Sequence, residues 1–181
     1  MKSLLQRKRF FIGGSIFLCL VFAGCLLITK TFTIVVYIEA SINSEEDNIG
    51  SEYFTLEGND VWEDHRDEIN SIESVEFAAK ITNQEDTEAT GQIYISDNGA
   101  LNTLSAIQNN ASLVLKGIVI PPNQTVVIER EESTQYLMNF EELKAQVESG
   151  DFYVYAIAEN VPFHIVVAES LAVIVSFTAG N

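Results

Sequence analysis

The chain has 181 residues, and its contents of 47% hydrophobic and 20% charged residues are typical of one packed globular domain and not of a disordered chain. Asp and Glu number 26 against 10 Lys and Arg, so the formal net charge is −16. A surface this acidic repels phosphate backbones, which argues against nucleic-acid binding through a basic face.

The N-terminal segment combines basic residues with a long apolar run. Lys2 and the three basic residues at positions 7–9 precede the run 10–28, and no acidic residue occurs before Glu39. A helix over this run spans about 28 Å, close to the hydrocarbon core of a bilayer at about 30 Å. Basic residues before the run and almost none after it predict a cytoplasmic N-terminus and a body outside the cytoplasm.

The end of the apolar run resembles the signal of bacterial lipoproteins. It reads Phe22-Ala23-Gly24-Cys25, where such signals usually have Leu-Ala-Gly-Cys. The resemblance implies cleavage before Cys25, with the lipid carried by Cys25. Residues 1–24 would then be the signal peptide, and residues 25–181 the exported domain. The departures from the pattern are Phe22 and the apolar residues 26–28, where a polar tether is usual.

Two other interpretations of this segment stay open. The run 10–28 can be an uncleaved transmembrane anchor, or part of a conventional cleaved signal. If the chain is a lipoprotein, Leu26 stands where an acidic residue would indicate inner-membrane retention, by resemblance to enterobacterial lipoproteins. Outer-membrane or surface placement is then favoured in an organism with two membranes. In every membrane-bound case the body belongs to the cell envelope.

Cysteine usage limits the chemistry of the exported domain. Cys19 and Cys25 both lie in the apolar run, and no cysteine follows them. After Cys25 the domain therefore has no internal disulfide, no thiolate metal site and no cysteine nucleophile.

After the apolar run, alternation of apolar and polar residues predicts a series of strands. Residues 29–40 form the first, a polar loop covers 41–50, and 53–56 is a short strand. Residues 60–69 are predicted as a short helix, because Val61, His65 and Ile69 recur on one helical face and Asn59 or Asp60 can cap it.

The second half of the chain continues the same pattern. Strands at 74–83 and 89–96 are predicted to form a hairpin, followed by a turn at 97–99. Residues 101–107 suit either a short helix or irregular structure. A second short helix is predicted at 139–148, ending at Gly150. Further strands are predicted at 113–120 and 125–130 around a Pro-Pro turn, at 152–158, and at 163–178 with an interruption near Glu169.

Seven to nine short strands with one or two brief helices predict an all-β fold, an antiparallel β-sandwich. The helices are too few to cover both faces of a parallel sheet. Immunoglobulin-like is used here as an architecture label, because the Cys and Trp hallmarks of antibody domains are missing from the sequence.

The acidic loop offers a candidate metal site. Glu45, Glu46 and Asp47 concentrate the hard oxygen ligands that calcium prefers. The loop lacks the Asp-x-Asp-x-Asp-Gly pattern with a distal Glu, so the favoured interpretation is a charged loop that keeps the protein soluble and protects sheet edges. No resident metal or other cofactor is predicted.

Catalytic motifs are missing from the sequence. His65 lies in the densest charged segment, at 62–68, but without metal-ligand spacing, and the favoured interpretation is a half-buried position on a solvated helix. His164 alternates out of phase with the apolar side of its strand and is predicted to face solvent. No Gly-x-Ser-x-Gly elbow or phosphate-binding loop occurs.

Aromatic residues at 53, 62, 136, 153 and 155 are candidates for a ligand-facing surface, although packing in the sheet is the favoured interpretation. We therefore expect a membrane-tethered envelope lipoprotein that is not an enzyme and has a structural or binding role, with an envelope protein or glycan as partner. The alternatives are an envelope hydrolase whose site is assembled from distant strands, and a calcium-dependent adhesion module.

Overall fold

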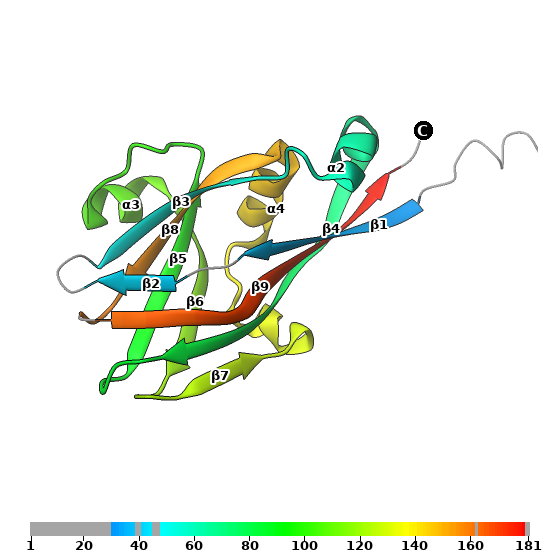
Figure 1. Cartoon of the computed structure of the whole chain (residues 1–181). Coiled ribbons are helices and arrows are strands. Elements are labelled where there is room, and N and C mark those ends of the chain that lie inside the picture. Colours follow the sequence, from blue (N-terminus) through cyan, green and yellow to red (C-terminus); the bar gives the residue numbers. More distant parts are fainter. Residues whose placement is uncertain (1–29, 39–40, 45–47, 162, 180–181) are drawn as a thin grey trace, which may run out of the picture.

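The computed structural model describes residues 30–38, 41–44, 48–161 and 163–179, which form two antiparallel sheets packed face to face (Figure 1). The first sheet contains β1 (Lys30–Ile38), β2 (Ser41–Ser44), β4 (Ile69–Asn83), β7 (Thr125–Ile128) and β9 (Phe163–Ala179). The second contains β3 (Ile49–Thr55), β5 (Ala89–Ser96), β6 (Ser112–Ile120) and β8 (Asp151–Ala158). The predicted antiparallel β-sandwich is confirmed.

The order of the strands makes β9 and β8 the central elements. The first sheet runs β1-β9-β4-β7, and β2 continues along the same edge of β9 as β1. The second sheet runs β3-β8-β5-β6. The α-helices of the described residues are α2 (Asp60–His65), α3 (Leu104–Asn110) and α4 (Phe140–Ser149), with 3-10 turns η1 (Arg66–Glu68) and η2 (Arg130–Tyr136).

The main core lies between the two sheets. Phe177 of β9 and Ile72 of β4 are fully buried, and they belong to one cluster with Phe152 of β8. Leu143 and Val147, on one face of α4, join the same cluster. Burial of each such side chain stabilises the fold by about 1.5–3 kcal/mol. Apolar residues at alternate positions of a strand therefore favour burial of one face of each sheet in the shared core.

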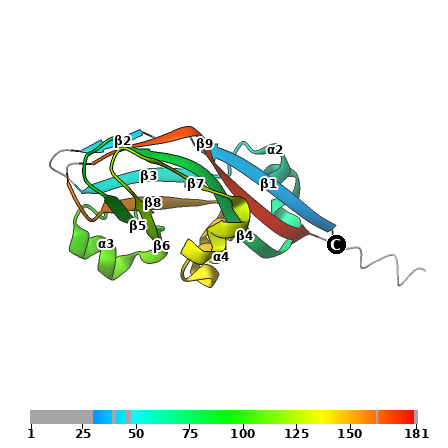
Figure 2. The ribbon, with the colours of Figure 1, turned by 90° about the horizontal axis from the view of Figure 1, so that it is seen from below.

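A second core covers the outer face of the second sheet. Tyr155 and Tyr94 form a buried cluster with Leu101 and Ile107. The helix α3 lies against the second sheet on the side away from the first (Figure 2). The hydroxyl of Tyr155, which is fully buried, donates to the carbonyl oxygen of Asn98 at 2.5 Å. The prediction that Tyr155 packs in the sheet is therefore confirmed.

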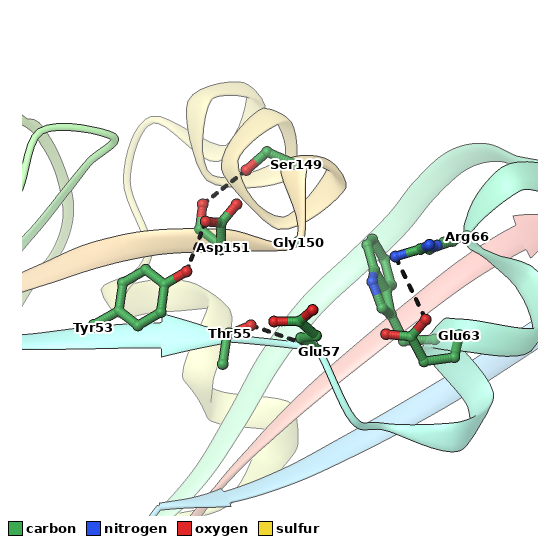
Figure 3. A pocket seen from close by; sticks show the side chains of 9 residues that line it. Tyr53, Thr55, Glu57, Glu63, Arg66, Ser149, Gly150 and Asp151 are labelled. Atoms are coloured by element: carbon green, nitrogen blue, oxygen red, sulfur yellow. Dashed lines mark hydrogen bonds and ion pairs between the residues drawn. The ribbon is translucent and has the colours of Figure 1, made fainter.

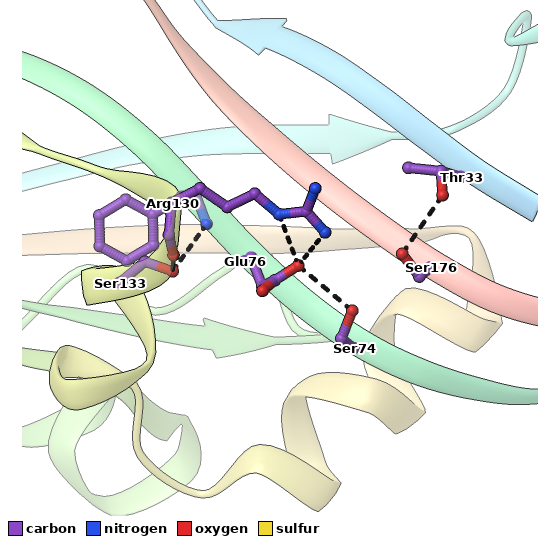
Figure 4. Close-up of polar contacts among 7 residues, drawn as sticks. Thr33, Ser74, Glu76, Arg130, Ser133 and Ser176 are labelled. Atoms are coloured by element: carbon purple, nitrogen blue, oxygen red, sulfur yellow. Dashed lines mark hydrogen bonds and ion pairs between the residues drawn. The ribbon is translucent and has the colours of Figure 1, made fainter.

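The turn η2 supplies a hydrogen-bond partner to β4 beyond the point where the pairing with β7 ends. The fully buried Ser133 accepts a hydrogen bond from the backbone N–H of Phe77 at 3.2 Å and donates to the carbonyl of Arg130 at 2.8 Å. Arg130 reaches back to Glu76 of β4, with 2.9 Å between its Nε and Oε2 (Figure 4). The side-chain hydroxyl thus satisfies a backbone donor that has no strand partner.

A single buried amide joins two of the connections through which the chain crosses between the sheets. The side chain of Asn83 is fully buried, and its Nδ2 donates to the carbonyl oxygens of Thr87 at 2.7 Å, Ile120 at 3.1 Å and Pro121 at 3.3 Å. Its Oδ1 accepts from the N–H of Glu85 at 3.0 Å. The β4–β5 and β6–β7 connections are therefore held to each other through one residue.

Two predicted connections differ from the structure. The strands predicted at 74–83 and 89–96 exist, but the hairpin is wrong, because β4 pairs with β9 and β7 whereas β5 pairs with β8 and β6. The polar loop predicted at 41–50 is also wrong, since it contains β2 and the start of β3. Pairing of β2 with β9 gives this polar segment its strand structure.

Three other predictions are refined by the structure. The ambiguous segment 101–107 contains a helix that starts at Leu104 and is capped by the side chain of Thr103. The helix predicted at 139–148 is confirmed, with Gly150 as its C-cap. The interruption predicted near Glu169 falls within the continuous strand β9, at a register shift against β4.

We expect Asn83→Asp to lower the free energy of unfolding by about 3 kcal/mol or more at neutral pH, because a buried carboxylate would face carbonyl oxygens with no proton to donate. Asn109→Asp, at an exposed position in α3, is the matched control and should change stability by about 0.5 kcal/mol or less. Denaturant unfolding of both variants measures the difference. Equal losses in the two variants would contradict the role given to Asn83.

Gly150→Ala should cost more stability than Gly117→Ala. Both glycines have positive φ, at 87° and 92°, so each substitution costs about 1 kcal/mol through the backbone. A Cβ at Gly150 would also lie 3.0 Å from Cζ2 of Trp62, whereas one at Gly117 meets nothing within 4 Å. Overpacking at Gly150 should add about 1–3 kcal/mol in equilibrium unfolding. Identical losses would show that Trp62 moves away freely.

Candidate functional site

A pocket of about 220 Å³ lies where the end of β3, helix α2 and the junction between α4 and β8 meet (Figure 3). Its lining comes from three segments of the chain: Tyr53, Thr55 and Glu57; Trp62, Glu63 and Arg66; Ser149, Gly150 and Asp151. Segments from both halves of the sequence therefore build one concave surface.

Sheet pairing brings Tyr53 and Asp151 together. The register of β3 against β8 places Thr55 opposite Asp151, so Tyr53 lies diagonally across from this carboxylate. The Tyr53 hydroxyl donates to Oδ2 of Asp151 at 2.7 Å (Figure 3). This hydrogen bond to the carboxylate raises the pKa of Tyr53 above its ordinary value, because loss of the phenolic proton would remove the bond and place two negative charges together.

Trp62 is held in the pocket wall by the local structure of α2. The side chain of Asn59 caps the helix by accepting from the backbone N–H of Trp62 at 3.2 Å, so the predicted cap is confirmed. Only 5% of Trp62 is exposed, and its indole lies against Gly150. Within the described part of the chain, Nε1 of Trp62 donates no hydrogen bond.

The charged residues of the pocket are mainly acidic. Glu63 and Arg66 form an exposed ion pair with 3.5 Å between their nearest charged atoms. Asp151 accepts from Tyr53, whereas the Glu57 carboxylate has no partner among the residues that the structure describes. Three carboxylates against one guanidinium leave a negative excess, which suits a ligand that carries positive charge.

The helical face predicted for α2 is off by one residue. The sequence pattern placed Val61, His65 and Ile69 toward the core, but Val61 is 38% exposed and the buried residue of α2 is Trp62. The helix ends at His65 and passes into η1, so the four-residue spacing stops after one turn. The sequence indicated that Trp62 was a candidate aromatic, but not that it lines a pocket.

The structure brings neither histidine into the pocket. The His65 ring packs on Phe32 of β1 with 3.9 Å between ring centroids, and its Nδ1 is buried without a hydrogen bond among the described residues. His164 lies in β9, half-buried, thirteen residues before Phe177, which is the β-partner of Phe32. At about 3.3 Å per strand residue, roughly 40 Å of strand separates the two histidines.

The predicted lipidation site and the predicted metal site lie outside the described part of the chain. They consist of Cys25 and of the acidic residues Glu45, Glu46 and Asp47, respectively. Among the described residues, no set of three His, Cys, Asp or Glu side chains is placed to hold a metal ion. Those residues also contain no helix of the length and apolarity needed to cross a membrane, and the run 10–28 is not among them.

Comparisons with known proteins identify no relative. No protein-family model matches the chain, and no curated protein matches it. Among solved structures, that of infectious bursal disease virus Gx strain aligns with 86% of this chain at 10% identity and a TM-score of 0.36. Dimeric latent PorU from Porphyromonas gingivalis aligns with 86% at 10% identity and a TM-score of 0.31. The chain spans 33% and 13% of these proteins, and both scores are too low to define its fold or function.

Asp151→Asn should lower the pKa of Tyr53 toward the ordinary tyrosine value, because the neutral amide removes the charge that opposes ionisation. Since the folded-state pKa is raised, the stability from this bond is present at neutral pH and is lost as the pH rises through it. Phenolate absorbance during a pH titration measures the shift, with Tyr53→Phe to identify the signal. Asp86→Asn, outside the pocket, should leave the titration unchanged, and no shift in Asp151→Asn would contradict the assignment.

Proposed function

We propose that this protein is a membrane-tethered lipoprotein of the cell envelope whose β-sandwich has a non-catalytic binding role. The observation that carries the tether is the charge asymmetry: basic residues precede the apolar run 10–28 and all 26 acidic residues follow it. The lipobox-like sequence ending at Cys25 makes this cysteine the point of attachment. An uncleaved helix over the same run is the competing form of anchor.

The binding role is supported by the pocket between β3, α2 and β8. It gathers acidic, hydroxyl and aromatic side chains from three segments, and neither His65 nor His164 lines it. Convergent polar groups in a concave site are typical of ligand recognition. Immunoglobulin-like is proposed as the finer description of the sandwich, supported by sheets of five and four antiparallel strands over a shared core.

Intact mass spectrometry of the membrane-extracted protein tests the tether. We expect the wild-type mass to lack residues 1–24 and to include lipid, because cleavage exposes Cys25 for acylation. Cys25→Ala should abolish both changes. Cys19→Ala, which replaces the other cysteine of the same apolar run, is the matched control and should be processed like the wild type.

Two results would contradict the proposal in different ways. Retention of residues 1–24 in the wild type and in Cys25→Ala would identify a helix-anchored protein in which Cys25 only packs. Turnover of hydrolase substrates by the purified protein, lost in His65→Ala or His164→Ala, would replace the non-catalytic role with an enzymatic one.

A further inference from the structure

We propose that the pocket between β3, α2 and β8 binds a small amino sugar through its protonated amine. This inference rests on the proposed binding role, but it is independent of how the protein is attached to the membrane. Four properties of the pocket carry it: an unpaired carboxylate, an indole N–H without an acceptor among the described residues, a small volume and a polar lining.

The carboxylates of the pocket favour a positively charged ligand. Asp151 accepts a hydrogen bond from the Tyr53 hydroxyl, and Glu63 forms an ion pair with Arg66. Both carboxylates therefore already have a partner within the protein. Glu57 is exposed, and its carboxylate has no partner within the described residues. A ligand ammonium group can donate to Glu57 and balance the negative excess of the pocket, forming a charge-assisted hydrogen bond.

The indole N–H of Trp62 can donate a hydrogen bond to an acceptor on the same ligand. The side chain is 95% removed from solvent, yet its Nε1–H donates to no group in the described part of the chain. A Cβ built on Gly150, itself part of the lining, would lie 3.3 Å from Nε1, so the absence of a side chain there leaves this edge of the indole accessible. The indole N–H is a donor only, so it pairs with an oxygen acceptor, which a sugar hydroxyl supplies.

Size and polarity separate an amino sugar from a basic amino acid side chain. A pocket of about 220 Å³ is smaller than the roughly 300–1,000 Å³ of sites for drug-sized ligands, so it suits a single sugar ring. The alkyl stem of lysine would need apolar walls, but the pocket lining includes the hydroxyl-bearing side chains of Tyr53, Thr55 and Ser149. Because Trp62 is buried, its ring face is unavailable for stacking, and recognition depends on its N–H edge.

The fluorescence of Trp62 provides a direct test, because it is the single tryptophan of the chain. The full-length protein in detergent micelles is titrated with D-glucosamine at about pH 6, where an amine is protonated. We expect a saturable change in emission. N-acetyl-D-glucosamine, which has the same ring without the positive charge, should bind about tenfold more weakly or not at all.

Matched variants assign the effect to the pocket. Glu57→Gln removes the unpaired carboxylate from an exposed position and should weaken glucosamine binding about tenfold without loss of folding. Asp86→Asn, in the β4–β5 connection, removes one acid of the same exposed kind and should leave binding unchanged. If both variants weakened glucosamine binding equally, binding would depend on the net charge of the protein and not on Glu57, and the proposal would be overturned.

Titrations with the other ligands show which part of the proposal is wrong if the expected result is not obtained. Equal binding of the acetylated sugar would overturn the role of the amine, and equal binding of cadaverine, which has no oxygen acceptor, would overturn the sugar. No saturable change with glucosamine would overturn the whole inference. The fluorescence titrations test the ligand, and intact mass spectrometry tests the lipid on Cys25. A negative result in one experiment therefore does not affect the conclusion from the other.

Discussion

The buried side chain of Asn83 fixes two of the connections between the sheets, the β4–β5 and the β6–β7 connection, against each other. Strand β4 leaves the first sheet at Asn83, and the β6–β7 turn returns the chain to that sheet, so the two connections lie beside each other. Each connection carries backbone carbonyl groups that need a hydrogen-bond donor. One fully buried amide satisfies carbonyls from both connections, and a second backbone contact, from the N–H of Asn123 to the carbonyl of Glu85 at 2.9 Å, reinforces the link. The two connections are therefore held side by side at one end of the sandwich.

The strands could be predicted from the sequence, whereas their partners could not. Alternation reports which residues of a segment share a face. The strand-forming composition of the segments between polar turns placed β5 and β8 to within one residue, but the predicted strand at 74–83 missed the first five residues of β4. Alternation carries no information on which sheet a segment joins. The polar connection at 84–88 has the length of a hairpin loop, but it crosses between sheets because Asn83 turns the chain there. Segment β2 was missed for the complementary reason: its strand structure comes from β9 and not from its own polar sequence.

The candidate site was predictable only in its separate parts. Trp62 and Tyr53 were recognisable as candidate aromatics, but the pocket needs Asp151, almost a hundred residues further along, which the β3–β8 register brings beside Tyr53. Gly150 was identified as the end of a helix, while its second role, leaving room for the indole, depends on tertiary packing. The helical face at 60–69 was misassigned because a helix of one and a half turns does not follow a four-residue repeat to its end.

The proposed tether and the proposed ligand site are connected through α2. One part of this segment packs on the start of β1, where His65 stacks on Phe32, and another part lines the pocket through Trp62. Helix α2, which contributes to the pocket lining, therefore lies beside β1 (Figure 1). Five residues join Cys25 to Lys30, and a fully extended chain of that length reaches at most about 18 Å. A lipid on Cys25 would thus hold the pocket close to the membrane surface, where it would meet ligands attached to that surface before those free in solution.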